Sequence, residues 1–159
     1  MRYFIAYVGM LVWAMWLGAL ISLFIFVPTL FHNDRDIALQ AAPQLFHVFE
    51  NIQPFLAGIA LILAVGAFLQ TKSWWTLITM VLLLIAAAFA AVSRIAITPR
   101  MDALVAQGQS GSPAFMQLHG MSMGIYSANI LWLLIVGLLL PHLISHAIRS
   151  TRQPIAASI

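Results

Sequence analysis

The chain has no cysteine and few charged residues, and each shortage excludes a class of protein. Without a thiol there is no disulfide, no thiolate metal site and no cysteine nucleophile. Charged residues make up 7% of the 159 residues, against about 25% in a typical soluble domain. The seven Lys and Arg are scattered, so the clustered basic face of a nucleic-acid-binding protein is missing. A water-soluble fold and a nucleic-acid partner are therefore excluded.

The sequence patterns of several enzyme classes are missing as well. There is no glycine-rich phosphate loop, and the residue order gives no support for a Ser-His-Asp hydrolase. A di-iron bundle needs carboxylates from all four helices, and Glu50 is the only glutamate in the chain. We therefore expect a non-enzymatic protein.

What the chain has instead is apolar length. Hydrophobic residues make up 63% of it, and the mean hydropathy is +1.01. A helix of about 20 apolar residues crosses a bilayer, and four such stretches lie at about residues 4–27, 44–69, 74–97 and 114–140. We predict an all-α fold with a single membrane domain over residues 1–159. It is an integral membrane four-helix bundle, antiparallel in up-down-up-down order, with both termini on the same side.

Local signals set the limits of these spans. Pro28 marks the end of the first. Asn33 can cap a short interfacial helix at about residues 34–42, because Asp36 follows three residues later as in a capping box. Ser112, followed by Pro113, forms a cap and first-turn pair for the fourth span.

Positive charges favour one orientation in the membrane. If the spans alternate, four lie on the side of the termini and three on the other. The four on the side of the termini are Arg2, Lys72, Arg149 and Arg152. The three on the other side are Arg35, Arg94 and Arg100. By the positive-inside rule, we expect cytoplasmic termini in an inner or plasma membrane.

Polar side chains of the spans gather at the end that holds the first and third connections. At about 100° per residue, His47 and Glu50 share one stripe of the second span, and Tyr126 and Asn129 lie in one arc of the fourth. We predict a ligand-binding polar cluster of nine residues. They are His47, Glu50, Arg94, Arg100, Asp102, His119, Ser122, Tyr126 and Asn129.

Glu50 and Arg94 are the natural ion pair in this cluster, because they lie a turn or two inside neighbouring helices. Charges that face lipid cost several kcal/mol, so such residues point into the bundle and pair. The pair has two interpretations. It either fixes the helix register or belongs to a proton, ion or headgroup site.

Histidine and methionine support a different hypothesis. His47 and His119 lie near the same membrane surface and could ligate haem b, and Met123 belongs to a methionine group suited to copper. No haem attachment motif is present, and methionine more often serves as flexible packing. We predict no cofactor, and keep haem or copper as the alternative, with His47, His119 and Met123 as candidate metal ligands.

Three short motifs carry a family resemblance: FIFVPTLF at 24–31, TPRMD at 98–102 and FMQLHGMS at 115–122. Over almost its whole length, the chain resembles the four-helix membrane family of unknown function that includes transmembrane protein 205. The resemblance implies a four-helix membrane fold with Arg100, His119 and Ser122 as motif residues. That family usually has an Asn shortly after the Ser, where this chain has Tyr126 and, one turn later, Asn129.

These observations lead to one functional expectation and one alternative. We expect a small membrane protein that binds a partner subunit, a lipid headgroup or a small solute at the polar cluster. Its partners are then the lipid bilayer and either other membrane subunits or a second copy of the chain. The alternative is a membrane redox or metal-handling protein that holds haem or copper through His47 and His119.

Overall fold

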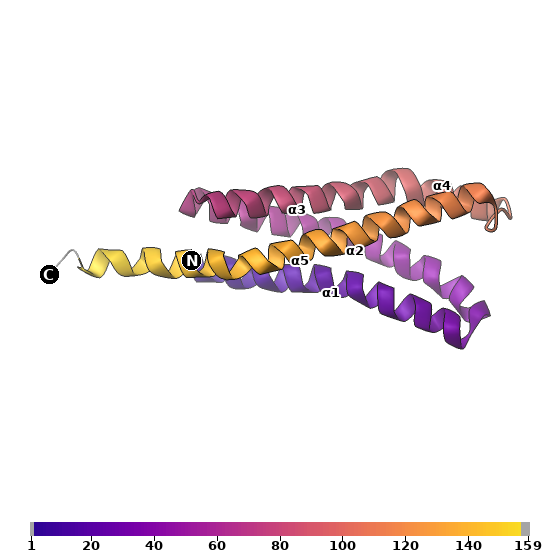
Figure 1. Ribbon diagram of the computed structural model, residues 1–159, viewed down its shortest axis with the longest axis horizontal. Coiled ribbons are helices and arrows are strands. Elements are labelled where there is room, and N and C mark those ends of the chain that lie inside the picture. The colour runs from indigo at the N-terminus through magenta and orange to yellow at the C-terminus, as the bar shows by residue number, and fades with distance from the viewer. Residues whose placement is uncertain (1, 157–159) are drawn as a thin grey trace.

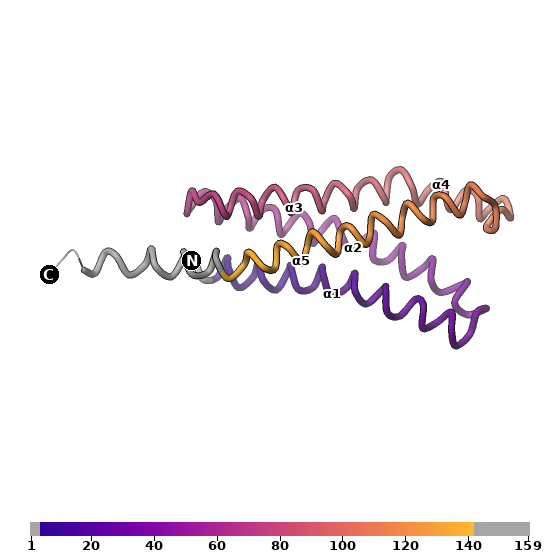
Figure 2. Tube along the Cα trace, viewed as in Figure 1, coloured from indigo at the N-terminus to yellow at the C-terminus, as the bar shows by residue number. Residues whose placement is uncertain are grey.

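The computed structural model describes the backbone of residues 2–156 and the side chains of residues 4–141 (Figure 2). The described chain is helical apart from short connections. Its elements are α1 (Arg2–Asn33), α2 (Arg35–Thr71), α3 (Trp74–Val92), the π-helical segment η1 (Ser93–Ile97), α4 (Thr98–Ala106) and α5 (Pro113–Ala156). Four stretches are long and apolar enough to span a membrane. The predicted all-α, four-helix membrane fold is confirmed.

The four spans surround a common axis. The chain reverses direction after α1, after α2 and between α4 and α5 (Figure 1). Around the bundle α1 packs on α2, α2 on α3, α3 on α5 and α5 on α1. Trp16, Leu20 and Leu133 are fully buried between them. Because α2 and α5 lie on opposite sides of this ring, their inward side chains meet on the bundle axis.

Helix α2 is longer than a bilayer is thick, and its excess lies at one end. The 37 residues of α2 extend about 56 Å at 1.5 Å per residue, against a hydrocarbon core of about 30 Å. Trp74 and Trp75, beside the turn at Lys72, are exposed aromatic residues of the kind that mark a membrane interface. Counted back from Lys72, about 20 residues of α2 cross the hydrocarbon core, which places Glu50 near the opposite boundary. Beyond it the α1–α2 corner and the α4–α5 connection diverge (Figure 1).

The first connection differs from the prediction. We expected a separate interfacial helix at residues 34–42, capped by Asn33, but α2 continues without a break from Arg35 to Thr71. The cap is Asp34, whose carboxylate accepts the backbone N–H groups of Asp36 and Ile37 at 3.0 and 3.1 Å. Pro43 lies inside the helix instead of starting it. In a packed membrane helix, neighbouring groups can compensate for the hydrogen bond that a proline removes.

The third span is not a regular α-helix over residues 74–97. At η1 the backbone N–H of Thr98 donates to the carbonyl of Ser93, five residues earlier. Pro99 provides the reason, because it has no N–H and its ring clashes with a carbonyl four residues before it. The wider π turn accommodates both effects. It also places Ser93 and Thr98 one turn apart, on the same side of the helix.

Close packing joins α1 to α5 at the other end of the bundle. The indole N–H of Trp13 donates to the Leu133 carbonyl at 2.7 Å. A Cβ added at Gly137 would overlap the same indole ring. Small residues allow such close contacts between membrane helices, so Gly137 fixes how α1 and α5 pack. The predicted cap of the fourth span is confirmed, since the Phe115 N–H donates to Ser112 Oγ at 3.2 Å.

Gly137→Ala should lower the thermal unfolding midpoint of the protein in detergent, because the Trp13 indole has to move. Gly124→Ala is the matched control on the same helix, where an added Cβ meets nothing within 4 Å. There the midpoint should stay or rise, since alanine favours a helix over glycine by about 1 kcal/mol. Equal shifts for the two variants would contradict this account of the packing.

Candidate functional site

Glu50 lies buried on the bundle axis near the diverging end, with 4% of its surface exposed. Its Oε1 atom accepts hydrogen bonds from three hydroxyl groups. The donors are Ser93 Oγ at 3.1 Å, Thr98 Oγ1 at 2.8 Å and Tyr126 Oη at 2.8 Å. They belong to η1, α4 and α5 respectively. These four side chains form the Glu50 centre, in which one carboxylate oxygen joins α2 to the third and fourth spans.

Aromatic packing holds the tyrosine of this centre in place. Tyr126 is 2% exposed. Its ring lies 5.5 Å from that of Phe46 and 6.1 Å from that of Phe49, measured between centroids, and both phenylalanines are on α2. Tilted rings at such distances attract one another. The phenol is therefore held against α2 with its hydroxyl directed at Glu50.

The predicted ion pair between Glu50 and Arg94 is wrong. Arg94 is exposed, and its guanidinium donates to Asn51 Oδ1 at 3.2 Å. The π turn explains the difference, because it gives the inward position to Ser93 and leaves the next side chain outside. In the part of the chain that the structure describes, no cation forms a salt bridge with Glu50.

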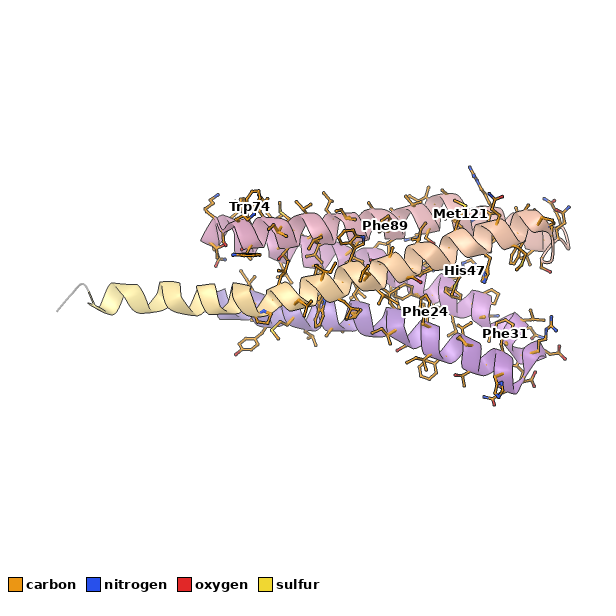
Figure 3. All side chains as sticks on the ribbon, viewed as in Figure 1. Phe24, Phe31, His47, Trp74, Phe89 and Met121 are labelled. Carbon is orange, nitrogen blue, oxygen red and sulfur yellow. The ribbon has the colours of Figure 1, made fainter. Side chains whose placement is uncertain are left out.

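The predicted polar cluster divides into a buried and an outer part. Glu50, Tyr126 and Asn129 are buried. The others are half-buried or exposed: His47, Arg94, Arg100, Asp102, His119 and Ser122. His47 lies on α2 at the diverging end (Figure 3). Its Nε2 atom is 3.4 Å from Asp102 Oδ1, and both side chains are about half exposed. This contact connects α2 to α4 outside the Glu50 centre.

The candidate metal ligands His47, His119 and Met123 lie on two helices, α2 and α5. Within residues 4–141, no group of three or more His, Cys, Asp or Glu is placed to hold a metal ion. His119 is exposed, and its ring stacks on Phe115 of its own helix at 6.1 Å. Met123 is half-buried. Ligation of haem by two histidines, or of copper by methionine, stays a hypothesis.

Sequence reasoning missed three residues of the site: Ser93, Thr98 and Gln53. Five residues of a regular α-helix exceed one turn of 3.6 residues, so Ser93 and Thr98 were not expected on one face. Pro99 was the available signal for the π turn. Gln53 is 1% exposed and follows Glu50 by three residues, a spacing that keeps two side chains on the same stripe.

Polar atoms without partners lie one turn deeper than Glu50. Among the described residues, four buried side-chain atoms have no hydrogen-bond partner. They are Trp16 Nε1, Gln53 Nε2, and Nδ2 and Oδ1 of Asn129. All three side chains are at most 1% exposed. Such orphaned groups are unusual in native proteins and need a physical explanation.

A pocket of about 90 Å³ lies between the helices at the opposite end. Most of its lining is apolar, including Trp13, Ala60, Ala64 and Val136, with Thr76 and Thr79 among the few polar residues. None of the predicted polar cluster lines it. The polar centre and this pocket are therefore separate features of the bundle.

Four apolar helices around a buried polar centre define a small integral membrane protein. A family model described as a domain of unknown function, DUF4149, matches residues 11–110, and the chain belongs to that family. The matched region contains Glu50, Ser93 and Thr98 and ends before Tyr126. No curated protein and no solved structure matches the chain. Membership of an uncharacterised family is thus supported, without evidence for the particular likeness to transmembrane protein 205.

Removing one hydroxyl donor from the Glu50 centre should destabilise the bundle. Tyr126→Phe and Ser93→Ala should each cost about 1.5–3 kcal/mol, the usual contribution of a hydrogen bond to a charged group. In a double-mutant cycle with Glu50→Gln, the effect of Tyr126→Phe should shrink, because its acceptor has changed. Arg94→Gln is the control and should add to Glu50→Gln within about 0.5 kcal/mol. Coupling to Arg94 but not to Tyr126 would contradict the geometry.

Proposed function

We propose that the protein is a non-enzymatic membrane protein whose Glu50 centre binds a small cation. The shared chemistry is a positively charged group, such as an ammonium, carried by a free solute or by a lipid headgroup. The observation that carries this proposal is a buried carboxylate with three hydroxyl donors and, among the described residues, no cation paired with it.

Charge balance supports a cationic ligand. Burying an ionised carboxylate is costly unless it is both hydrogen-bonded and paired. The hydroxyl groups of Ser93, Thr98 and Tyr126 supply the hydrogen bonds, but they bring no positive charge. A cation at this position would supply it. Carboxylate and hydroxyl oxygens can accept hydrogen bonds from an ammonium group, and carboxylates are also ligands for hard metal cations.

The depth of the centre supports a ligand that comes from the membrane surface. Glu50 lies about 20 residues of α2 away from the turn at Lys72, near the far boundary of the hydrocarbon core. Lipid headgroups occupy this depth. Beyond it the helical hairpins diverge (Figure 1), and the outer pair of His47 and Asp102 lies on the same side.

Glu50→Gln should weaken cation binding about tenfold or more, because the substitution removes the charge and keeps the shape. Binding of ethanolamine, choline and sodium to the purified protein would be measured by calorimetry. Lipid nanodiscs with and without phosphatidylethanolamine would separate a headgroup from a free solute. Asp36→Asn, an exposed acid at the start of α2, is the control and should bind as the wild type does. Equal affinities of the wild type and Glu50→Gln would overturn the proposal.

We also infer cytoplasmic termini in an inner or plasma membrane, from the distribution of Lys and Arg. The absence of cysteine makes this easy to test, since an introduced thiol is the only one. Ser110→Cys, in the α4–α5 connection, should react with an impermeant maleimide added to intact cells. Lys72→Cys, in the α2–α3 turn, should react only after the cells are lysed. The reverse pattern would invert the topology.

A further inference from the structure

The three side chains with orphaned atoms, Trp16, Gln53 and Asn129, form what we call the amide layer. We propose that this layer is a second binding site, for a small uncharged molecule that both donates and accepts hydrogen bonds. Water is the smallest such molecule, and a small hydroxyl- or amide-bearing solute has the same chemistry. The inference goes beyond the cation site, because it rests on different residues and involves no charge.

Two hydrogen bonds place the three side chains at one depth. The bond from Tyr126 to Glu50 aligns α5 with α2. The two helices run in the same direction (Figure 1), so Asn129 and Gln53, each three residues further on, lie one turn deeper. On the other side of the bundle, the bond from Trp13 to the Leu133 carbonyl aligns α1 with α5. These two helices run in opposite directions (Figure 1).

Residue spacing from the Trp13–Leu133 bond places the Trp16 indole in the same layer. Trp16 is three residues from Trp13 toward the polar end, and Asn129 is four residues from Leu133 in the same direction. Both side chains are buried, at 0% and 1% exposure. The amide layer therefore crosses the bundle from α1 to α2 and α5, just inside the Glu50 centre.

The donor and acceptor inventory decides what kind of molecule fits. The indole of Trp16 can only donate, whereas each amide offers two donors and one acceptor oxygen. A bare cation cannot accept a hydrogen bond from the indole N–H, and a bare anion such as chloride cannot donate one to the Asn129 oxygen. A neutral molecule with both functions can accept from and donate to such atoms, and buried water makes about three hydrogen bonds of this kind. Lipid cannot provide them within the hydrocarbon region.

Proton NMR of the wild-type protein in deuterated detergent tests this directly. The Trp16 indole proton and the side-chain amide protons of Gln53 and Asn129 should show dipolar cross-peaks to bound water. Cross-peaks to a non-water signal that survives dialysis would identify a retained solute, which also supports the site. Cross-peaks to protein protons alone would mean a dry layer and would overturn the proposal.

Replacing the two amides with apolar side chains provides a second test, because an empty layer and an occupied layer should shift the thermal midpoint in opposite directions. If the amides have no ligand, the double variant Gln53→Met and Asn129→Leu should raise the thermal midpoint, because orphaned polar groups are removed. If a ligand holds them, the midpoint should fall. Gln44→Leu is the control, since Gln44 is exposed on the same helix and its replacement should change the midpoint little.

The two sites can be told apart by measuring cation binding in the Asn129→Leu variant. Affinity within about twofold of the wild type, with loss of the water cross-peaks, supports two separate sites. If the Asn129→Leu variant also loses cation binding, the two sites are one, and the proposal of a second site is overturned. If Glu50→Gln leaves cation binding unchanged while the cross-peaks are present, the cation proposal fails and the amide layer stands.

Discussion

The polar end of the bundle depends on three hydrogen bonds, which one oxygen of Glu50 accepts from hydroxyl groups. Inside a membrane, a polar group that finds no partner within the protein has no water to replace it. The carboxylate meets this constraint by drawing donors from two other spans. Their convergence fixes both the height and the rotation of α2 relative to its neighbours. The amide layer, one turn deeper, follows from the same register.

The two ends of the bundle solve different packing problems. At the end where α1 begins, a glycine lets the Trp13 indole lie against α5, and the helices are held closely. At the polar end the hairpins diverge (Figure 1), and contact between them depends on hydroxyl groups and aromatic rings. Close packing tolerates little change in side-chain volume, whereas hydrogen bonds at an open end can be exchanged for bonds to a ligand. Close contacts at the first end thus support the fold, and hydrogen bonds hold the polar end together.

The sequence predicted the four spans because a long hydrophobic stretch is a strong signal for a membrane helix, and local irregularities do not change it. It also brought Glu50, Tyr126 and Asn129 together, since regular helical spacing applies to α2 and α5. It failed where the helix is irregular. Ser93 and Thr98 share a face only through a π turn, and the pairing of Glu50 with Arg94 was inferred from charge alone. Three uncharged hydroxyl groups took the place that an arginine was expected to fill. The cap moved from Asn33 to Asp34 because α2 begins with no separate interfacial helix.

The uneven distribution of helix length makes the protein sensitive to the thickness of its membrane. A helix longer than the hydrocarbon core must tilt, bend or protrude, and in α2 the excess lies on the side of Glu50. Trp74 and Trp75 hold the opposite end at its interface. A thicker bilayer would therefore submerge the Glu50 centre in hydrocarbon, and a thinner one would raise it into the headgroups. Lipid composition thus sets whether hydrocarbon or headgroups surround the bundle at the depth of the buried carboxylate, without any change in the protein itself.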